Sequence, residues 1–275
     1  MGSVPKDLKI AKVIPLHKSG DTRCFNNYRP ISILPCFSKI LEKLVYKRIL
    51  AHLNKHSILY EHQYGFRTNH STDMALLHLV EKIYTAINNN EYALGIFLDL
   101  SKAFDTVEHS ILLSKLHHYG FQGLAYNWLT SYVSNREQFV LANGCASSRI
   151  QLSYGVPQGS ILGPLLFLIY INDLASVSST ALPILFADDT NLILTHKHFD
   201  SLIREANYGL TKISEWFQIN KLSLNIKKSN FIIFTGKNKM YPKSSAKLSI
   251  DGNVIIQVSS TKFLGVLIDE ALILN

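Results

Sequence analysis

Two adjacent carboxylates are the residues of this chain that most suggest chemistry. Asp188 and Asp189 separate two apolar runs, residues 181–185 and 192–194. Each run is typical of a short strand, so the sequence predicts that the aspartate pair lies at the tip of a two-residue hairpin. An aspartate at such a tip usually serves only the turn, so the pair must be interpreted together with other carboxylates.

A third carboxylate, Asp99, ends another apolar run, residues 96–98. A carboxylate at the end of a hydrophobic strand is costly unless it is paired or binds a metal ion. Three carboxylates on strand ends can hold two divalent cations, an arrangement that supports phosphoryl transfer. Together with the motifs around these residues, this pattern makes a polymerase the leading hypothesis.

The elements that must position these carboxylates are predicted from the periodicity of apolar residues. We expect strand 92–100 to carry Asp99, and Ser71 or Thr72 to cap the helix that precedes it. Residues 1–30 are expected to be irregular because three prolines block long helices. Further elements are expected as helices at about 34–54, 72–87, 109–119, 124–134, 164–174 and 200–219, and strands at 137–142, 149–153, 230–234 and 263–268, with turns at 143–144 and 251–252. This irregular alternation favours an α+β fold with a largely antiparallel sheet.

The composition allows a substantial core and suggests a polyanionic partner. The chain has 275 residues, is 47% hydrophobic and has a formal net charge of +8. Nucleic acid fits that charge, although a mildly basic enzyme without a nucleic-acid role fits it equally well. The most apolar run, residues 165–171, is far shorter than the ~20 residues of a membrane span, so no membrane partner is expected.

The cysteines and histidines indicate neither a disulfide framework nor a metal site. Cys24, Cys36 and Cys145 are odd in number and widely spaced, which favours a reducing compartment, so we expect an intracellular protein of the cytoplasm and nucleus that is not secreted. The histidine pairs 117–118 and 196/198 lack acidic or cysteine partners at ligand spacing and are expected at the surface.

Several short motifs follow one another in a fixed order along the chain. They are NYRPIS at 27–32, YGFR at 64–67, HST at 70–72, LDLSKAFD at 98–105, GVPQGS at 155–160, FADD at 186–189, LSLN at 222–225, KK at 227–228 and FLG at 263–265. Each motif alone is weak, but the ordered set is specific. With these motifs the chain resembles the reverse transcriptase of non-LTR (LINE-type) retrotransposons and, more distantly, the reverse transcriptases of group II introns.

The resemblance implies a polymerase-type right hand in the α+β class. It assigns fingers to residues 1–90 and a palm with an antiparallel sheet to residues 91–275, ending near the primer-grip strand, with the thumb missing or truncated. The implied activity is RNA-directed DNA polymerisation with an RNA template, a DNA primer and dNTPs. The rival interpretation is a catalytically silent retroelement remnant that acts at most as an RNA-binding protein.

The resemblance also implies a metal site and a proton donor. Asp99, Asp188 and Asp189 would hold two Mg²⁺ ions, for which Mn²⁺ could substitute. The alternative is that these aspartates are ordinary carboxylates of turns and strand edges that bind no metal. Lys228 resembles the lysine that protonates pyrophosphate, and Lys227 competes for the same match.

Two motif residues are implied to contact the nucleotide sugar. Phe104, five residues after Asp99, would exclude a 2′-hydroxyl and so select dNTPs, although a core phenylalanine fits as well. Asp105, next to it, is expected to be structural. Gln158 would lie near the sugar and template, since its amide both donates and accepts; an ordinary loop glutamine is the alternative.

Four residues are implied to lie near the triphosphate of the dNTP. Lys18 and Arg29 match positions in the fingers that clamp the phosphates, a suitable place for cations, with a plain surface role as the alternative. Ser101 and Lys102 would border the nucleotide with their amides, and a solvated surface fits them equally well.

Five residues are implied to contact template or primer. Arg67 is a candidate for the template backbone, and Gly159 would allow the backbone to approach the base pair closely. Phe263, Leu264 and Gly265 resemble the primer-grip strand, although a core strand is equally compatible with them.

Overall fold

A computed structural model describes residues 2–236, 239–242 and 246–272. The chain forms two compact units, each built from two separated segments. Unit 1 comprises Met1–Leu59 and Phe104–Ile171, and unit 2 comprises Tyr60–Ala103 and Asn172–Asn275. The division into fingers at 1–90 and palm at 91–275 stays a prediction. Among the described residues, no helix combines the length and apolar character that crossing a bilayer requires.

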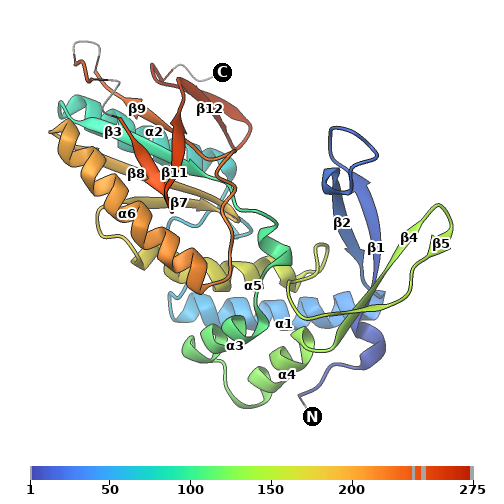
Figure 1. Ribbon diagram of the computed structural model, residues 1–275. Coiled ribbons are helices and arrows are strands. Elements are labelled where there is room, and N and C mark those ends of the chain that lie inside the picture. Colours follow the sequence, from blue (N-terminus) through green and yellow to red (C-terminus); the bar gives the residue numbers. More distant parts are fainter. Residues whose placement is uncertain (1, 237–238, 243–245, 273–275) are drawn as a thin grey trace. The chain divides into compact units, whose positions relative to one another are not determined.

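The secondary structure is α+β, as predicted (Figure 1). The α-helices are α1 (Cys36–Lys55), α2 (Thr72–Asn88), α3 (His109–His118), α4 (Gly123–Val133), α5 (Leu162–Ile171) and α6 (Phe199–Ile219). The strands are β1 (Ile10–His17), β2 (Tyr28–Ile33), β3 (Tyr92–Leu98), β4 (Arg136–Ala142), β5 (Cys145–Ala146), β6 (Ile150–Leu152), β7 (Leu182–Phe186), β8 (Asp189–His196), β9 (Asn230–Phe234), β10 (Leu248–Ile250), β11 (Asn253–Gln257), β12 (Ser260–Phe263) and β13 (Val266–Asp269). Short 3₁₀ turns occupy Lys6–Lys9, Phe25–Asn27, Ala103–Asp105 and Asn172–Ser176.

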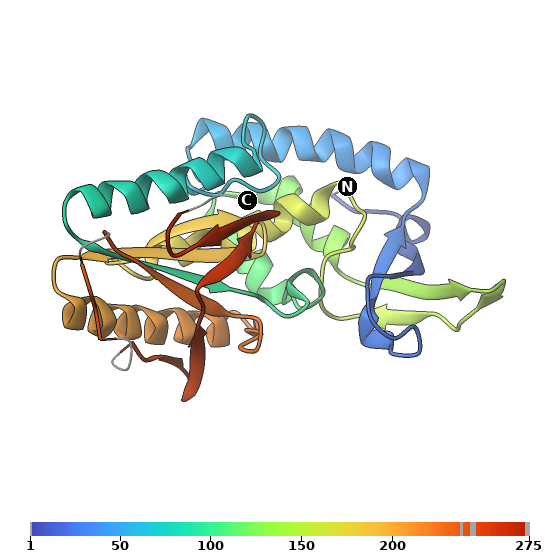
Figure 2. The same ribbon diagram turned by 90° about the horizontal axis from the view of Figure 1, so that it is seen from above.

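Unit 2 is organised around a six-stranded sheet with the order β10-β11-β9-β3-β8-β7. Four of its five pairings are antiparallel, and β9 pairs with β11 in parallel, so the predicted antiparallel sheet is confirmed except at that pair. Helices α2 and α6 cover opposite faces of the sheet (Figure 2). Because both faces are covered, the central strand β3 is apolar along most of its length and its last six residues are buried.

Both covering helices form where the apolar residues recur at helical spacing. In α6 the buried residues include Leu202, Leu210 and Ile213, which lie on one face. Helix α2 buries Leu79 and Ile83 on its inner face, and the Ser71 hydroxyl caps its N-terminus by accepting a hydrogen bond from Met74 N. The prediction of a cap at Ser71 or Thr72 is thereby confirmed for Ser71.

Unit 1 combines helices α1, α3, α4 and α5 with a small mixed sheet. Strands β1 and β2 form an antiparallel hairpin, and β1 also pairs in parallel with β4 (Figure 1). Helix α5 is buried along most of its length, from Leu162 to Ile171, as predicted for the most apolar run of the sequence.

The sequence predictions for residues 1–30 and for residues 263–268 are wrong. Residues 1–30 are not irregular, because 10–17 and 28–33 form the β1–β2 hairpin, in which Pro15 lies opposite Pro30. The expected single strand at 263–268 is instead a hairpin of β12 and β13 that turns at Leu264 and Gly265. Both turn residues have positive φ, +48° and +96°, the combination that a tight two-residue hairpin needs.

A buried carboxylate fixes the start of α5 inside unit 1. Glu42 is 1% exposed and accepts hydrogen bonds from Ser38 Oγ at 3.2 Å and Tyr132 Oη at 3.1 Å. Its other oxygen accepts from the backbone N–H groups of Ile161 at 2.6 Å and Leu162 at 3.4 Å. Burial and the Glu42 charge raise the pKa of Tyr132, which keeps its hydroxyl a donor. The first orphan N–H groups of α5 are thus satisfied by a negative charge at the positive end of the helix.

We predict that Glu42→Gln destabilises unit 1, because the amide places an N–H₂ group where one of these donors needs an acceptor. The expected loss is about 1–3 kcal/mol of unfolding free energy, measured by urea unfolding followed by circular dichroism. Glu137→Gln is the matched control: Glu137 forms an exposed ion pair with Arg149 at 3.7 Å and should cost less than about 1 kcal/mol. Equal losses in the two variants would contradict a special role for Glu42.

Candidate active site

The antiparallel pairing of β3 and β8 brings the predicted carboxylates to one end of the sheet. The last register pair at this end is Leu98 opposite Thr190. Asp99 follows Leu98 and Asp189 precedes Thr190, so the two aspartates leave the strand pair at the same end. Asp188 lies in the connection between β7 and β8, directly before Asp189. Residues that are 89 positions apart in the sequence are therefore neighbours in unit 2.

The turn itself differs from the prediction by one residue. Phe186 pairs with Asp189, so the two-residue loop consists of Ala187 and Asp188, and Asp189 begins β8. Ala187 is buried and has φ +55°, a left-handed conformation that a residue with a Cβ rarely adopts. The predicted turn is wrong by one residue because two adjacent aspartates are typical turn residues. Nothing in the sequence indicates that Ala187 adopts the left-handed backbone conformation of the turn.

The three carboxylates influence one another electrostatically. Burial, followed by the negative charges of Asp188 and Asp99, raises the pKa of Asp189 from its ordinary value of 3.8 to about 6. The Asp189 residue as a whole is exposed at the surface, so water screens part of this effect, but burial and the neighbouring negative charges shift the pKa in the same direction. A cation placed among these carboxylates would relieve their repulsion.

The backbone around Asp99 is held by residues 223–229. Asn225 N donates to Asp99 O at 2.8 Å, and Ser101 N donates to Ser223 O at 2.8 Å. Asp99 N donates to Ser229 Oγ at 3.2 Å. The sequence prediction missed Ser229, whose only signal was a small polar residue directly after the LSLN and KK motifs. The Ser101 amide is thus paired with Ser223 O, and its contact with a triphosphate stays a prediction.

The same segment places a lysine next to Asp99. Lys228 Nζ lies 3.9 Å from Asp99 Oδ2, and the two side chains are 62% and 38% exposed. Of the two competing lysines, Lys228 is therefore the one that pairs with the carboxylate among the described residues. Lys102 is exposed and has φ +50°, and its place beside a nucleotide stays a prediction.

Phe104 and Gln158 belong to unit 1, which resumes at Phe104, directly after the segment that carries Asp99. The Phe104 ring stacks on Phe167 of α5, with ring centroids 4.6 Å apart. Gln158 Nε2 donates to Asp105 Oδ1 at 2.8 Å, so Asp105 has the structural role expected of it. The contacts of Phe104 and Gln158 with a nucleotide sugar stay predictions.

Gly159 approaches protein backbone closely. It has φ +115°, and a Cβ at this position would lie 2.5 Å from Ser32 O. Next to it, Ser32 N donates to Gln158 O at 2.7 Å. The glycine is therefore required by the contact with β2, whether or not a base pair also approaches it.

The predicted phosphate-binding cations Lys18 and Arg29 lie on the β1–β2 hairpin of unit 1. Lys18 directly follows β1, and its backbone N–H donates to Asn27 O at 2.8 Å. Arg29 lies in β2 opposite Leu16. Both side chains are exposed, and their contact with a triphosphate stays a prediction.

Two predicted template and primer contacts in unit 2 have structural roles. Arg67 Nη1 donates to the backbone oxygens of Tyr60 at 2.7 Å and Gln63 at 3.2 Å, so it fastens the segment that precedes it. Phe263 is buried in the core, with its ring centroid 6.0 Å from that of Phe97. Leu264 and Gly265 form the β12–β13 turn. Contacts of these residues with nucleic acid stay predictions.

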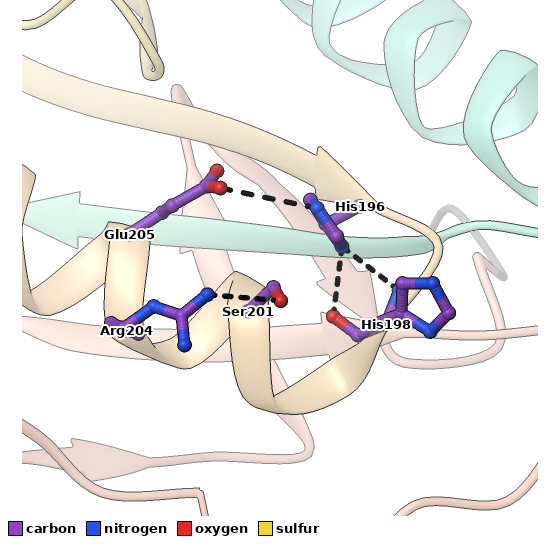
Figure 3. A network of polar contacts seen from close by, with 5 residues as sticks. All are labelled: His196, His198, Ser201, Arg204 and Glu205. Carbon is purple, nitrogen blue, oxygen red and sulfur yellow. Dashed lines mark hydrogen bonds and ion pairs between the residues drawn. The ribbon is translucent and has the colours of Figure 1, made fainter.

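The histidines are not arranged as metal ligands. Figure 3 shows His196 at the end of β8, where its Nδ1 lies 2.9 Å from the N–H of His198 and its Nε2 lies 3.9 Å from Glu205 Oε1. Arg204 donates to Ser201 Oγ in the same network. His196 and Asp189 occupy opposite ends of β8. Within the part of the chain that the structure describes, no three His, Cys, Asp or Glu side chains converge closely enough to enclose a metal ion by themselves.

We predict that Asp189→Asn stabilises the metal-free protein at neutral pH. The pKa of Asp189 is higher in the folded state, so the folded protein binds more protons than the unfolded protein between about pH 4 and about pH 6. The free energy of unfolding therefore falls as pH rises through this window, and above the window this contribution to stability is fully lost. Asp189→Asn should have a Tm roughly 1–4 °C above that of the parent at pH 7.5 in EDTA. Its Tm should also fall less than that of the parent between pH 4 and 6.

Asp200→Asn is the control for this measurement, since it removes the same charge from the exposed first turn of α6. It should leave Tm unchanged or lower it slightly, because a negative charge stabilises a helix N-terminus. The raised pKa of Asp189 would be contradicted if the parent Tm did not change between pH 4 and 6 and Asp189→Asn had the same Tm as the parent.

Comparison with known proteins identifies the family of the chain. A family model described as reverse transcriptase (RNA-dependent DNA polymerase) matches residues 16–268. The chain is 34% identical over 273 residues to a probable RNA-directed DNA polymerase from transposon X-element of Drosophila melanogaster, covering 98% of this chain and 30% of that protein. It is 31% identical over 280 residues to the RNA-directed DNA polymerase from mobile element jockey of Drosophila melanogaster, covering 99% of this chain and 30% of that protein.

Solved structures show the same fold at low sequence identity. Apo telomerase from Candida tropicalis, truncated from its C-terminal domain, has a TM-score of 0.64 at 13% identity, covering 99% of this chain and 56% of that chain. Telomerase from Candida albicans in complex with a fragment of telomeric RNA has a TM-score of 0.60 at 14% identity, covering 99% of this chain and 46% of that one. The predicted right-hand polymerase fold is confirmed by this likeness. With a family match that covers most of its length, the chain belongs to the reverse transcriptase family.

Proposed function

We propose that this chain is the polymerase core of an RNA-directed DNA polymerase, which adds dNTPs to the 3′ end of a primer. The observation that carries the proposal is the meeting of Asp99, Asp188 and Asp189 at one end of the β3–β8 pair. Family membership supports it. The chain spans about 30% of the length of the curated relatives it matches, so the activities of those whole proteins are not transferred to it.

The donor set of the site suits a hard divalent cation. Mg²⁺ is usually bound by one or two carboxylates, and water and substrate phosphates complete its coordination. Asp99, Asp188 and Asp189 supply carboxylate oxygens of this kind, and a site that depends on substrate phosphates needs no enclosure by three side chains. We propose that these residues hold two Mg²⁺ ions, with Mn²⁺ as a substitute, which supply activation of the primer 3′-hydroxyl and stabilisation of the departing pyrophosphate.

The chain's own residues orient the reactants and handle one proton. The primer 3′-hydroxyl loses its proton to solvent as its oxygen forms a bond with the α-phosphorus of the dNTP, and the bond from that phosphorus to the bridging oxygen breaks, which releases pyrophosphate. The hydrogen bonds from Asn225 N to Asp99 O and from Asp99 N to Ser229 Oγ keep the backbone of Asp99 in place during this exchange. Lys228, beside Asp99, is suited to donate a proton to the departing pyrophosphate, as a general acid does.

The proposed partners follow from the reaction and the charge of the chain. They are an RNA template, a DNA primer and dNTPs, and the net charge of +8 suits the phosphates of all three. We also propose an intracellular location in cytoplasm and nucleus, where such templates and dNTPs occur.

We predict that Asp188→Asn abolishes primer extension on an RNA template with Mg²⁺ without unfolding the protein. Loss of a metal-binding carboxylate should lower the rate by at least about a thousandfold. Asp200→Asn, which removes an exposed carboxylate from α6, should extend primers at the parent rate. Extension by Asp188→Asn at the parent rate would overturn the assignment. A parent that binds RNA but never extends a primer would instead favour the catalytically silent remnant.

A second prediction separates the two neighbouring lysines. Lys228→Met should slow single-turnover extension by about a hundredfold, the typical contribution of a general acid, because it removes the ammonium group beside Asp99. Lys227→Met removes the same charge one residue away and should slow extension no more than about threefold. Equal effects of the two variants would reduce the role of Lys228 to general electrostatic attraction of nucleic acid.

A further inference from the structure

A segment outside the named strands runs along the edge strand β7 and reaches the turn that carries Asp188. Leu185 N donates to His62 O at 2.9 Å, and Tyr64 N donates to Leu185 O at 2.8 Å. These two bonds flank Gln63, which pairs with Leu185 in a parallel bridge. The backbone of Gln63 is therefore fixed relative to β7, and the residue is only 2% exposed.

The side-chain oxygen of Gln63 binds the turn directly. Gln63 Oε1 accepts hydrogen bonds from Ala187 N at 2.9 Å and from Gly65 N at 2.9 Å. Because both partners are N–H donors, they fix which end of the amide is oxygen. The β7–β8 ladder closes at Phe186 and Asp189, so Ala187 N belongs to a loop residue, and Gln63 supplies an acceptor for it.

Gly65 makes this close approach possible. A Cβ on Gly65 would lie 2.2 Å from Ala187 N and 2.9 Å from Phe186 C. Both obstructing atoms are backbone atoms of the turn, so no side-chain rotation could relieve the clash. Arg67 adds a further restraint, since its Nη1 donates to Gln63 O at 3.2 Å.

The glutamine at position 63 leaves a buried donor unpaired, and packing alone does not explain why a glutamine is present. Gln63 Nε2 is buried and has no hydrogen-bond partner among the described residues. A methionine would fill similar space without an unpaired donor, so the glutamine is unfavourable at this position unless its oxygen is needed. That oxygen is bound to the residue with the left-handed backbone, Ala187, immediately before Asp188 and Asp189.

We infer that Gln63 is a positioning residue, which acts through the Ala187 amide to hold the Ala187–Asp188 turn and so to direct the carboxylates of Asp188 and Asp189. The inference rests on the proposed function, because it assigns Gln63 to the support of the same site. Gln63 touches neither substrate nor metal. Residues that orient metal ligands from behind typically change metal affinity or activity by about 10–100-fold when they are replaced.

The test compares Gln63→Met with Gln257→Met in the full chain. Gln257 belongs to unit 2, and its Nε2 donates to Tyr241 Oη at 2.8 Å, so the same substitution removes a hydrogen bond that does not involve the turn. The first measurement is hydrogen exchange of the Ala187 amide by NMR of protein labelled with ¹⁵N-alanine. We expect about 10–100-fold faster exchange in Gln63→Met and no change in Gln257→Met. Unchanged exchange of Ala187 in Gln63→Met would overturn the inference.

The second measurement is Mn²⁺ binding followed by EPR, which needs no catalytic turnover. Gln63→Met should weaken binding by about 10–100-fold, whereas Gln257→Met should bind within about threefold of the parent. In primer extension, Gln63→Met should lower kcat by a similar factor and leave KM for dNTP within about threefold. A merely structural role would lower the Tm of both methionine variants and leave Mn²⁺ affinity unchanged at temperatures where they are folded.

The outcomes separate this inference from the proposed function. A parent that binds Mn²⁺ but extends no primer would contradict the proposed polymerase and leave the role of Gln63 to be decided by exchange and Mn²⁺ affinity. Faster Ala187 exchange with unchanged Mn²⁺ affinity would show that Gln63 binds the turn without positioning the carboxylates, and would overturn the inference. A parent that binds no Mn²⁺ would contradict both.

Discussion

Repulsion among Asp99, Asp188 and Asp189 is the constraint on which the rest of unit 2 depends. Three carboxylates at one end of a strand pair repel one another, and burial together with the charges of Asp188 and Asp99 raises the pKa of Asp189. The strands that carry them must therefore be held by interactions that do not involve the carboxylates. Strand β3 supplies these, because its apolar residues are buried between α2 and α6 (Figure 2), and β8 pairs with it from Leu98–Thr190 to Tyr92–His196.

Local hydrogen bonds then fix the backbone at and next to the aspartates. The 223–229 segment binds the backbone of Asp99 on both sides, through Asn225 and Ser229. Gln63 binds the Ala187 amide in the turn before Asp188 and Asp189. These supports come from parts of the chain far apart in sequence, and all of them belong to unit 2. The metal-binding part of the proposed function is thus contained in one compact unit.

Much of this organisation could be predicted from the sequence, since strand β3, helix α6 and the motif carboxylates have strong local patterns. The failures have physical causes. Strands β1 and β2 contain prolines and exposed residues, and they form because they pair with each other and because β1 also pairs with β4. The turn at Leu264 requires a left-handed leucine, which no propensity indicates. The support from Gln63 depends on a contact with Ala187 124 residues away, which a single sequence cannot show.

The central claim is that these three aspartates together form the cation site of a polymerase. The most direct measurement is an anomalous difference map from a crystal of the protein with Mn²⁺, a primer–template duplex and a non-hydrolysable dNTP. The account predicts anomalous density bounded by Asp99, Asp188 and Asp189 and by the triphosphate. Mn²⁺ density elsewhere, or a bound nucleotide whose phosphates face away from these carboxylates, would contradict it.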